Sequence, residues 1–368
     1  MLSSPSLRPD EQAGLLLREL YRRHGYQCYR MSRFEPYDLY AKNKSFLVSE
    51  NILTFTDTDG RLMALKPDVT LSIIKNIQPA PHTLEKVCYH ENVYRTSPAS
   101  MGYREIMQTG LECVGDLDLA SMGEAVALAA ESLGLLSEAY LLDLGHVGLV
   151  SGLLEEAAEL DGDVRAGLLA ELSRKNVPAL RSLCARAGLA HDLAEKLCRL
   201  SRLYGPPAEI LPQLKALVSG AEAAAALEEL EGLCRILKRL GLLDRVRLDF
   251  SIVNDMRYYN GLIFRGYLPG LASGVLAGGR YDNLLRRMGK TGQAIGFAVY
   301  LDQLERLEAD GGYDVDVLLV YGPQDDPAAV AARAEELMAG GKSVRAERTV
   351  PQRLRYRELV RFSEGGQA

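Results

Sequence analysis

Two pairs of polar side chains are spaced to hold a small charged ligand. Asp68 and Thr70 stand where a helix is expected to begin, so they offer a negative charge and a hydroxyl to an ammonium group. Gln108 and Glu112 are four residues apart in a predicted strand, and their side chains therefore face the same side. The alternative interpretations are capping of the helix for the first pair and a buried polar pair within a sheet for the second.

The elements that must position these side chains follow from hydrophobic spacing and turn residues. Pro9-Asp10-Glu11 opens a helix, and Asp59-Gly60 predicts a tight turn between two strands. We expect helices over 9–25, from 67 onward and over 120–136, and strands at 27–31, 52–55, 61–65, 86–95 and 104–115.

The second half of the chain changes character twice. Residues 151–240 are rich in Ala, Leu, Glu and Arg with helical periodicity, and they predict an all-helical segment with breaks at 161–163, Pro178 and Pro206-Pro207. Strand character returns at 246–250 and continues to 264. We then expect a helix at 301–307, a strand at 315–321, a helix at 327–338 and a strand at 343–345, which make a β-α-β unit that soon stops.

Composition describes an ordinary water-soluble protein. The 368 residues are 25% charged and 47% hydrophobic, with a net charge of −6 that does not attract a polyanion over long range. We expect no membrane span, and the first ten residues lack a signal-peptide pattern. The six cysteines form no C-x-x-C pair and the five histidines show no metal-ligand spacing, so buried free thiols in the cytoplasm and no metal site are expected.

Four runs in order resemble the signature segments of the class II histidyl-tRNA synthetases, and the likeness extends over about residues 8–310. The family's LRPEGT, FRYERPQxGRxREFxQxGxE, RGLDYYTG and GGRYD with GFAxGLERL are matched in turn. The matching runs are LKPDVT at 65–70, VYR with REIMQTGLE at 93–112, NDMRYYNG at 254–261, and GGRYD with AIGFAVYLDQL at 278–304.

Two arginines of that pattern are replaced. The family's arginine before the Tyr-Tyr pair is Asn254 here, and its final, phosphate-gripping arginine is Gln303. A neutral amide lacks the fixed charge and forked donors that Arg offers to a triphosphate. Losing one such contact commonly costs about 3–4 kcal/mol of transition-state stabilisation. The segment 313–368 is also short for the family's anticodon-binding domain.

These departures make the chain similar to the regulatory subunit of ATP phosphoribosyltransferase, a synthetase paralogue of histidine biosynthesis. The resemblance implies an α+β fold with a class II synthetase-like antiparallel sheet flanked by helices. The core would comprise 1–150 and 241–310, with a helical insertion at 151–240 and a truncated anticodon-binding-like α/β segment at 313–368. It further implies a non-catalytic cytoplasmic protein without cofactor, metal, tRNA or membrane partner.

The resemblance also implies the effector and the partner. Glu112 and Gln108 would meet the imidazole and ammonium of histidine, the tyrosines would supply phenol groups and aromatic walls, and Arg95 would meet the ligand carboxylate. The partner would be the short catalytic subunit, with a homodimer of this chain inside a hetero-octamer. The predicted histidine-binding residues are Asp68, Thr70, Arg95, Gln108, Glu112, Tyr258, Tyr259 and Tyr281.

Two other functions stay open at this point. A working histidyl-tRNA synthetase would need its missing arginines supplied elsewhere. A synthetase-like module for another amino acid would keep the fold and change the ligand. For the tyrosines, an ordinary place in a core strand is the alternative to a binding role.

Overall fold

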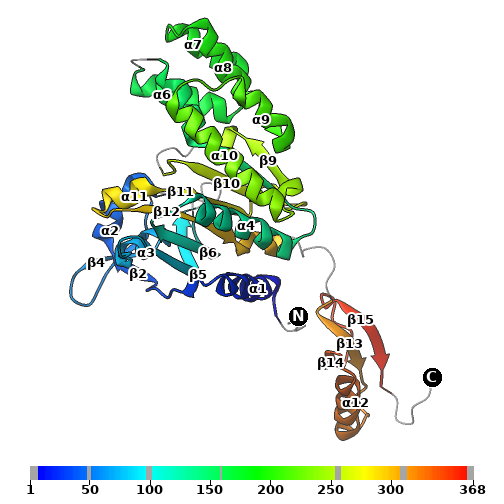
Figure 1. Ribbon diagram of the computed structural model, residues 1–368. Coiled ribbons are helices and arrows are strands. Elements are labelled where there is room, and N and C mark those ends of the chain that lie inside the picture. Colours follow the sequence, from blue (N-terminus) through cyan, green and yellow to red (C-terminus); the bar gives the residue numbers. More distant parts are fainter. Residues whose placement is uncertain are drawn as a thin grey trace. The chain divides into compact units, whose positions relative to one another are not determined.

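The computed structural model describes residues 7–47, 51–96, 102–157, 160–252, 258–306 and 313–362 (Figure 1). Contacts within the chain divide it into two compact units, Met1–Glu305 and Arg306–Ala368. The larger unit is built on a nine-stranded sheet, and the smaller unit on a three-stranded sheet.

The nine-stranded sheet forms the centre of the larger unit. Its pairs are antiparallel apart from β1/β5 and β7/β9, which are parallel. This predominantly antiparallel sheet with flanking helices confirms the predicted α+β fold. In spatial order the strands are β1 (Gln27–Cys28), β5 (Leu84–Thr96), β6 (Tyr103–Gly115), β12 (Gln293–Tyr300), β11 (Leu276–Arg280), β10 (Leu262–Tyr267), β7 (Leu141–His146), β9 (Val246–Asp249) and β8 (Tyr204–Gly205).

The two longest strands, β5 and β6, present a different set of side chains to each face of the sheet. They pair in register from Leu84↔Gly115 to Thr96↔Tyr103. Because successive side chains alternate, Cys88 belongs to one hydrophobic cluster while Val87 and Tyr89 belong to the other. β5 therefore contributes side chains to both hydrophobic clusters, one on each face of the sheet.

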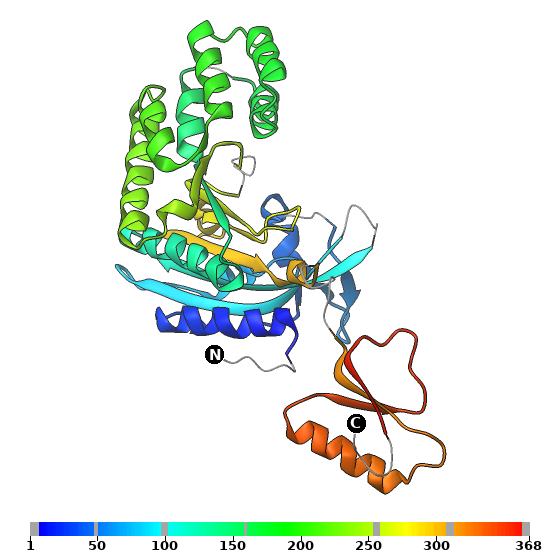
Figure 2. The same cartoon turned by 90° about the vertical axis from the view of Figure 1, so that its right-hand side faces the viewer.

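Helices α1 (Pro9–Arg23) and α4 (Leu119–Leu136) cover one face of this sheet. Figure 2 shows α1, in dark blue, running along the long strands. The buried hydroxyl of Tyr21 lies 3.0 Å from Ser132 Oγ on α4, and the Tyr21 ring meets Phe297 of β12 edge-on. Aromatic packing and one buried hydrogen bond thus fix α1, α4 and the sheet together.

The expectation that no segment has the character of a membrane span needs a correction. Within the part of the chain that the structure describes, α4 is the one helix that is long and apolar enough to cross a membrane. Most of that helix is buried inside the protein. Its apolar composition is accounted for by packing in the largest hydrophobic cluster, which includes Val126, Leu128 and Leu133.

The opposite face of the sheet carries a smaller layer around a second hydrophobic cluster. The predicted hairpin is present, with Gly60 in the left-handed region at φ 84° within its turn. The helix expected from residue 67 begins only at Thr70, because Asp68 accepts a hydrogen bond from Leu71 N instead of entering the helix. The elements of the layer are β2 (Phe34–Pro36), α2 (Tyr37–Ala41), η1 (Lys44–Phe46), β3 (Thr54–Thr56), β4 (Leu62–Leu65), α3 (Thr70–Asn76) and α11 (Asp282–Arg287).

Helices dominate the sequence between β7 and β9. The predicted breaks are confirmed, since α6 begins at Gly162 and α9 at Pro207. The all-helical expectation for 151–240 is wrong in one place, because β8 pairs there with β9. The assignment of 151–240 as an insertion stays a prediction. The helices are α5 (Val147–Glu155), α6 (Gly162–Ser173), α7 (Val177–Arg186), α8 (His191–Arg202), α9 (Pro207–Lys215), α10 (Ala221–Arg239) and η2 (Leu243–Arg245).

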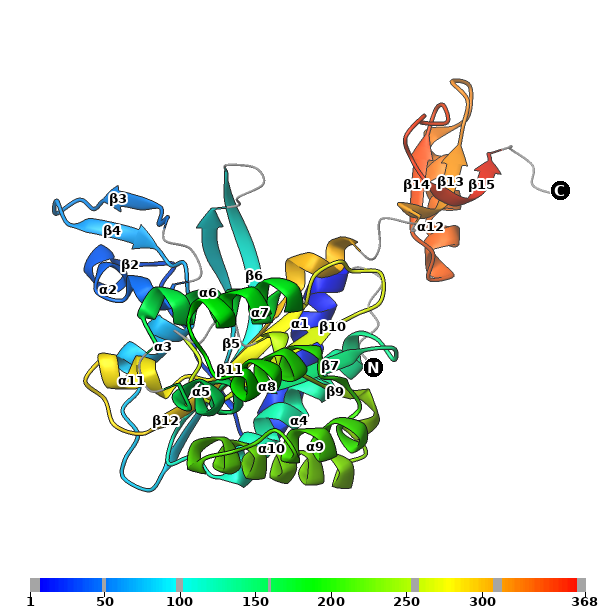
Figure 3. The ribbon, with the colours of Figure 1, turned by 90° about the horizontal axis from the view of Figure 1, so that it is seen from above.

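The smaller unit is a parallel sheet in the order β14-β13-β15 with one helix beside it (Figure 3). β13 (Val315–Val320), α12 (Pro327–Ala339) and β14 (Val344–Glu347) match the predicted β-α-β unit. β15 (Tyr356–Arg361) was not predicted, because its charged and largely exposed residues carry little hydrophobic signal. The short helical segment η4 (Leu301–Arg306) is a 3₁₀ helix at the end of the larger unit.

Candidate functional site

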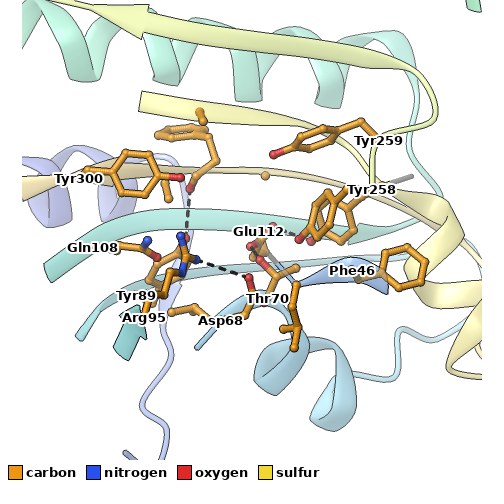
Figure 4. A pocket seen from close by; sticks show the side chains of 17 residues that line it. Phe46, Asp68, Thr70, Tyr89, Arg95, Gln108, Glu112, Tyr258, Tyr259 and Tyr300 are labelled. Carbon is orange, nitrogen blue, oxygen red and sulfur yellow. Dashed lines mark hydrogen bonds and ion pairs between the residues drawn. The ribbon is translucent and has the colours of Figure 1, made fainter. Parts of the chain in front are cut away.

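A pocket lies between the central sheet and the smaller layer, and all eight predicted binding residues line it (Figure 4). These residues lie at the start of α3, on β5 and β6, just before β10, and directly after β11. The empty space, counted out to the mouth, is about 650 Å³.

Glu112 is the electrostatic centre of the pocket. It is 2% exposed, and its two carboxyl oxygens accept hydrogen bonds from Thr70 Oγ1 at 2.7 Å and from the Tyr281 hydroxyl at 2.5 Å. No cation of the described residues pairs with it. Burial therefore raises the pKa of Glu112 to about 8, although both hydrogen bonds lower it. A cation or a strong donor entering the pocket would stabilise the ionised carboxylate.

A glycine makes room for that carboxylate. Gly296 is paired with Glu112 across β12 and β6, and a Cβ added to it would lie 1.7 Å from Glu112 Oε2. Any side chain here would displace the Glu112 carboxyl from the position in which it meets Thr70 and Tyr281. Gly296 belongs to the last signature run, but no role was predicted for it from the sequence.

Asp68 and Arg95 form a second polar group in the pocket. Arg95 Nη2 lies 3.9 Å from Asp68 Oδ2, and Arg95 Nε donates to the Pro67 carbonyl at 2.8 Å. Burial raises the pKa of Asp68, against the charge of Arg95 and the hydrogen bond from Leu71 N. Asp68 thus accepts a hydrogen bond from the first turn of α3, although the N-cap residue is Val69, and the same side chain also lines the pocket. Its second oxygen has only a loose contact with a guanidinium.

Gln108 supplies the clearest unmet hydrogen-bonding group. The side chain is 3% exposed, and among the described residues its Nε2 has no partner. A buried donor left unpaired costs about 1–3 kcal/mol, so an acceptor on a ligand would recover that cost. In Figure 4, Gln108, Arg95 and Tyr300 lie toward one end of the view, and Phe46 and Tyr258 toward the other.

Aromatic rings form the other wall. The Tyr258 ring lies 4.8 Å from Tyr259, 5.7 Å from Tyr281 and 6.1 Å from Phe46, measured between centroids. Burial, followed by the nearby carboxylates, raises the pKa values of Tyr258 and Tyr281 well above 10. Their phenols therefore stay neutral and keep their protons for donation. Such a wall suits a flat ring with polar atoms at its edge.

Several residues of the pocket were not predicted from the sequence. Tyr89 could have been found, because it lies six residues before Arg95 on one strand and so faces the same side. Tyr89 donates to the Phe297 carbonyl at 3.4 Å. Tyr300 stands in the last signature run, four residues after Gly296. The remaining residues that were missed are Phe46, Leu47, Val69, Ala277, Phe297 and Ala298.

The two replaced arginines have different outcomes. Gln303 is on η4, where its Oε1 accepts from Ser273 Oγ at 3.2 Å, and it is not among the residues that line the pocket. Asn254 lies outside the described residues, so its replacement is known from the sequence alone. Among the described residues that line the pocket, Arg95 is the only cation. No group of three or more metal-ligating side chains occurs in the part of the chain that the structure describes.

Comparison with known proteins identifies the family. The family model for histidyl-tRNA synthetase matches residues 6–304. The ATP phosphoribosyltransferase regulatory subunit of Clostridium kluyveri is 31% identical over 84% of this chain and 82% of its own length.

Solved structures agree on the fold. A Bacillus halodurans ATP phosphoribosyltransferase regulatory subunit/histidyl-tRNA synthetase superposes with a TM-score of 0.74 at 24% identity over 98% of both chains. A chain of the Thermotoga maritima ATP phosphoribosyl transferase complex gives 0.62 at 20% identity, over 79% of this chain and 97% of that one. The chain therefore belongs to the ATP phosphoribosyltransferase regulatory subunits, a family with the histidyl-tRNA synthetase fold.

Proposed function

We propose that this protein is a non-catalytic cytoplasmic subunit that binds histidine in the pocket around Glu112 and makes the short catalytic subunit of ATP phosphoribosyltransferase responsive to it. Family membership supports the partner, as does the Thermotoga maritima complex. The observation that carries the ligand is Glu112, a buried carboxyl held by two neutral donors and by no cation of the described residues.

Histidine matches the polar groups of the pocket. Its imidazole presents an N–H at the edge of a flat ring, which suits the Glu112 carboxylate and the tyrosine wall. Its ammonium and carboxylate suit the acceptor Asp68 and the donors Arg95 and Gln108. A purely apolar amino acid would leave Glu112 without a new donor, so the pocket favours a side chain that can hydrogen-bond.

Comparison with the signature segments of the histidyl-tRNA synthetases argues against aminoacylation activity. The histidine-contacting positions of the synthetase pattern keep residues able to form hydrogen bonds. The two positions that handle ATP charge have become the neutral amides of Asn254 and Gln303. The electrostatic stabilisation of a transferring phosphoryl group is thereby weakened, while recognition of the amino acid is retained.

Control of the partner then requires linkage between two sites. Histidine can shift the activity of the assembly only through a difference in its affinity for two arrangements of the complex. By the same linkage, the ligands of the catalytic subunit must change the affinity of this pocket for histidine. We further propose that the chain forms a homodimer within a hetero-octamer with that subunit.

The test uses the assembled enzyme. The chain is co-expressed with the short catalytic subunit, and phosphoribosyltransferase activity is measured with and without histidine, for the wild type and for Glu112→Ala. We expect inhibition of the wild type and at least a tenfold higher inhibitory concentration for the variant, with circular dichroism confirming that it is folded. Unchanged inhibition in a folded Glu112→Ala complex would exclude this pocket as the sensor.

The remaining alternatives are settled by two measurements on the isolated chain. A thermal-shift screen of all amino acids should find stabilisation by histidine, because a ligand that binds only the folded state raises the melting temperature. Stabilisation by a different amino acid alone would favour the synthetase-like module for another ligand. Robust ATP–pyrophosphate exchange with histidine would instead support a working synthetase.

A further inference from the structure

Two thiols that are far apart in the sequence meet across neighbouring strands. Cys28 of β1 and Cys88 of β5 are paired directly in the parallel register, and their Sγ atoms are 3.7 Å apart. We propose that this pair is an oxidation site, at which hydrogen peroxide converts the two thiols into a reversible intramolecular disulfide. The proposal does not depend on which ligand the pocket around Glu112 binds.

The backbone already has the spacing that a disulfide needs. Neighbouring strands lie about 4.8 Å apart, and disulfide-bonded cysteines have Cα atoms about 4.4–6.8 Å apart. To reach a bond of about 2.05 Å the two sulfurs must approach by roughly 1.6 Å, which rotation of two small side chains can supply. The pairing of Gln27 with Val87 in the same ladder holds the strands together while this happens.

The two thiols differ in access, which sets the order of the reaction. Cys28 is exposed and can meet a dissolved oxidant, whereas Cys88 is fully buried. Burial, then the neighbouring Cys28, raises the pKa of Cys88 to about 12. Cys28 is therefore the thiol that reacts first, and Cys88 is the resolving thiol.

Three arginines and one carboxylate, Glu91, line the surface pocket that contains the pair. The arginines are Arg18, Arg30 and Arg33. None of these three guanidiniums forms an ion pair with a carboxylate in the described part of the chain. Arg18 lowers the pKa of Cys88 against the effect of burial. An electropositive, partly exposed setting is the environment in which thiols become reactive.

The reaction balances with hydrogen peroxide as the only co-reactant. The Cys28 thiolate attacks one peroxide oxygen, the O–O bond breaks, and the departing hydroxide takes up the proton released by Cys28 to become water. Cys28 is then a sulfenic acid. The Cys88 sulfur attacks it, the S–O bond breaks, and the hydroxide leaves with the Cys88 proton as a second water. Two electrons pass from the thiols to the peroxide, and an added dithiol reverses the change.

The remaining cysteines provide the internal comparison. Cys113, Cys184, Cys198 and Cys234 are all buried, and all six cysteines lie in the described part of the chain. Cys198 helps to raise the pKa of Cys184, so these two thiols are the rival pair. Both are shielded in the helical segment, where a dissolved oxidant has little access.

The experiment treats the reduced, full-length protein with hydrogen peroxide, blocks the remaining thiols with N-ethylmaleimide, and digests with trypsin without reductant. We expect a disulfide between peptide 24–30, which holds Cys28, and peptide 87–95, which holds Cys88. Two of the six thiols should be lost and should return after treatment with dithiothreitol. Cys28→Ser and Cys88→Ala should each abolish the linked peptide, while Cys198→Ala should leave it intact.

Three results would overturn the proposal. One is a wild-type protein that keeps all six thiols under peroxide doses that oxidise free glutathione. Another is a linked peptide from a different pair, such as Cys184 with Cys198. The third is a disulfide between two copies of Cys28, visible as a dimer on a non-reducing gel. Circular dichroism of each variant keeps a folding defect from being taken for a loss of the site.

Discussion

A fully buried and a partly buried polar cluster lie near Tyr281, and they differ in how their charges are balanced. In the pocket, Glu112 has hydroxyl partners, and burial raises its pKa to about 8. In the partly buried cluster, Glu229 of α10 meets His146 Nε2 at 3.0 Å and Arg280 at 3.5 Å. Burial alone would raise the pKa of Glu229, but its hydrogen bond to His146 and the charges of His146 and Arg280 lower it. Glu229 is paired with His146 and Arg280, whereas Glu112 has no cationic partner among the described residues.

The balanced cluster has a structural role. Arg280 Nε lies 2.9 Å from Asp282 Oδ2, and Asp282 also accepts hydrogen bonds from Asn260 and from Ala294 N. Together with Glu229 and His146, this chain of contacts joins α10 to β7 and to β11, the strand that Tyr281 follows. A carboxylate that is paired with cations holds elements together, whereas a buried carboxylate without them is suited to receive a ligand.

The sharpest way to break this comparison is to neutralise each glutamate in turn. Glu112→Gln should weaken histidine binding by at least about 100-fold, or roughly 2.7 kcal/mol, because the carboxylate acceptor is lost. The matched Glu229→Gln should leave the Kd within about twofold while lowering the free energy of unfolding by about 1–2 kcal/mol, since its ion pairs are only partly buried. Isothermal titration calorimetry and urea unfolding measure the two effects. Equal losses of affinity would show that the clusters are not distinct.

A second test uses pH, because folding raises the pKa of Glu112 and lowers the pKa of Glu229. The folded-state pKa of Glu112 is raised from 4.5 to about 8, so the folded state holds a proton that the unfolded state has released between these values. Its contribution to stability is present below pH 4.5 and is lost as the pH rises toward 8. Without ligand, the free energy of unfolding of Glu112→Gln should therefore rise by about 2 kcal/mol relative to that of the wild type as the pH goes from 6 to 8. Glu229→Gln should show no such gain, and urea unfolding at both pH values makes the comparison.

The smallest expected effect concerns Gln108, whose replacement should preserve or raise stability but lower the affinity for histidine. Gln108→Leu removes the unpaired buried donor, so the ligand-free protein should be as stable as wild type or more stable. Histidine binding should weaken about tenfold, or roughly 1.4 kcal/mol, because one ligand hydrogen bond is lost. Thermal unfolding with and without histidine measures both. If stability falls and affinity is unchanged, Gln108 is a structural residue and not a ligand-binding one.

Much of the molecule could be predicted from local patterns. The period of the hydrophobic residues predicted α1, the long strands β5 and β6, and the helices between β7 and β9. The strand spacing of Gln108 and Glu112 placed both side chains on one face, and both line the pocket. β15 and β8 were missed, because an exposed charged strand and a two-residue strand carry no periodic signal.

The tertiary structure alone decided which distant groups meet. The sequence determined that Asp68, Glu112 and Tyr281 are polar or aromatic residues in signature runs. Strand register and layer packing then brought Tyr281 and Thr70 onto opposite oxygens of Glu112, and set Gly296 where the carboxyl needs room. The same register placed Cys28 against Cys88, although no C-x-x-C spacing announced it. Pairing across a sheet joins residues that are far apart in the chain, so no local pattern can specify those contacts.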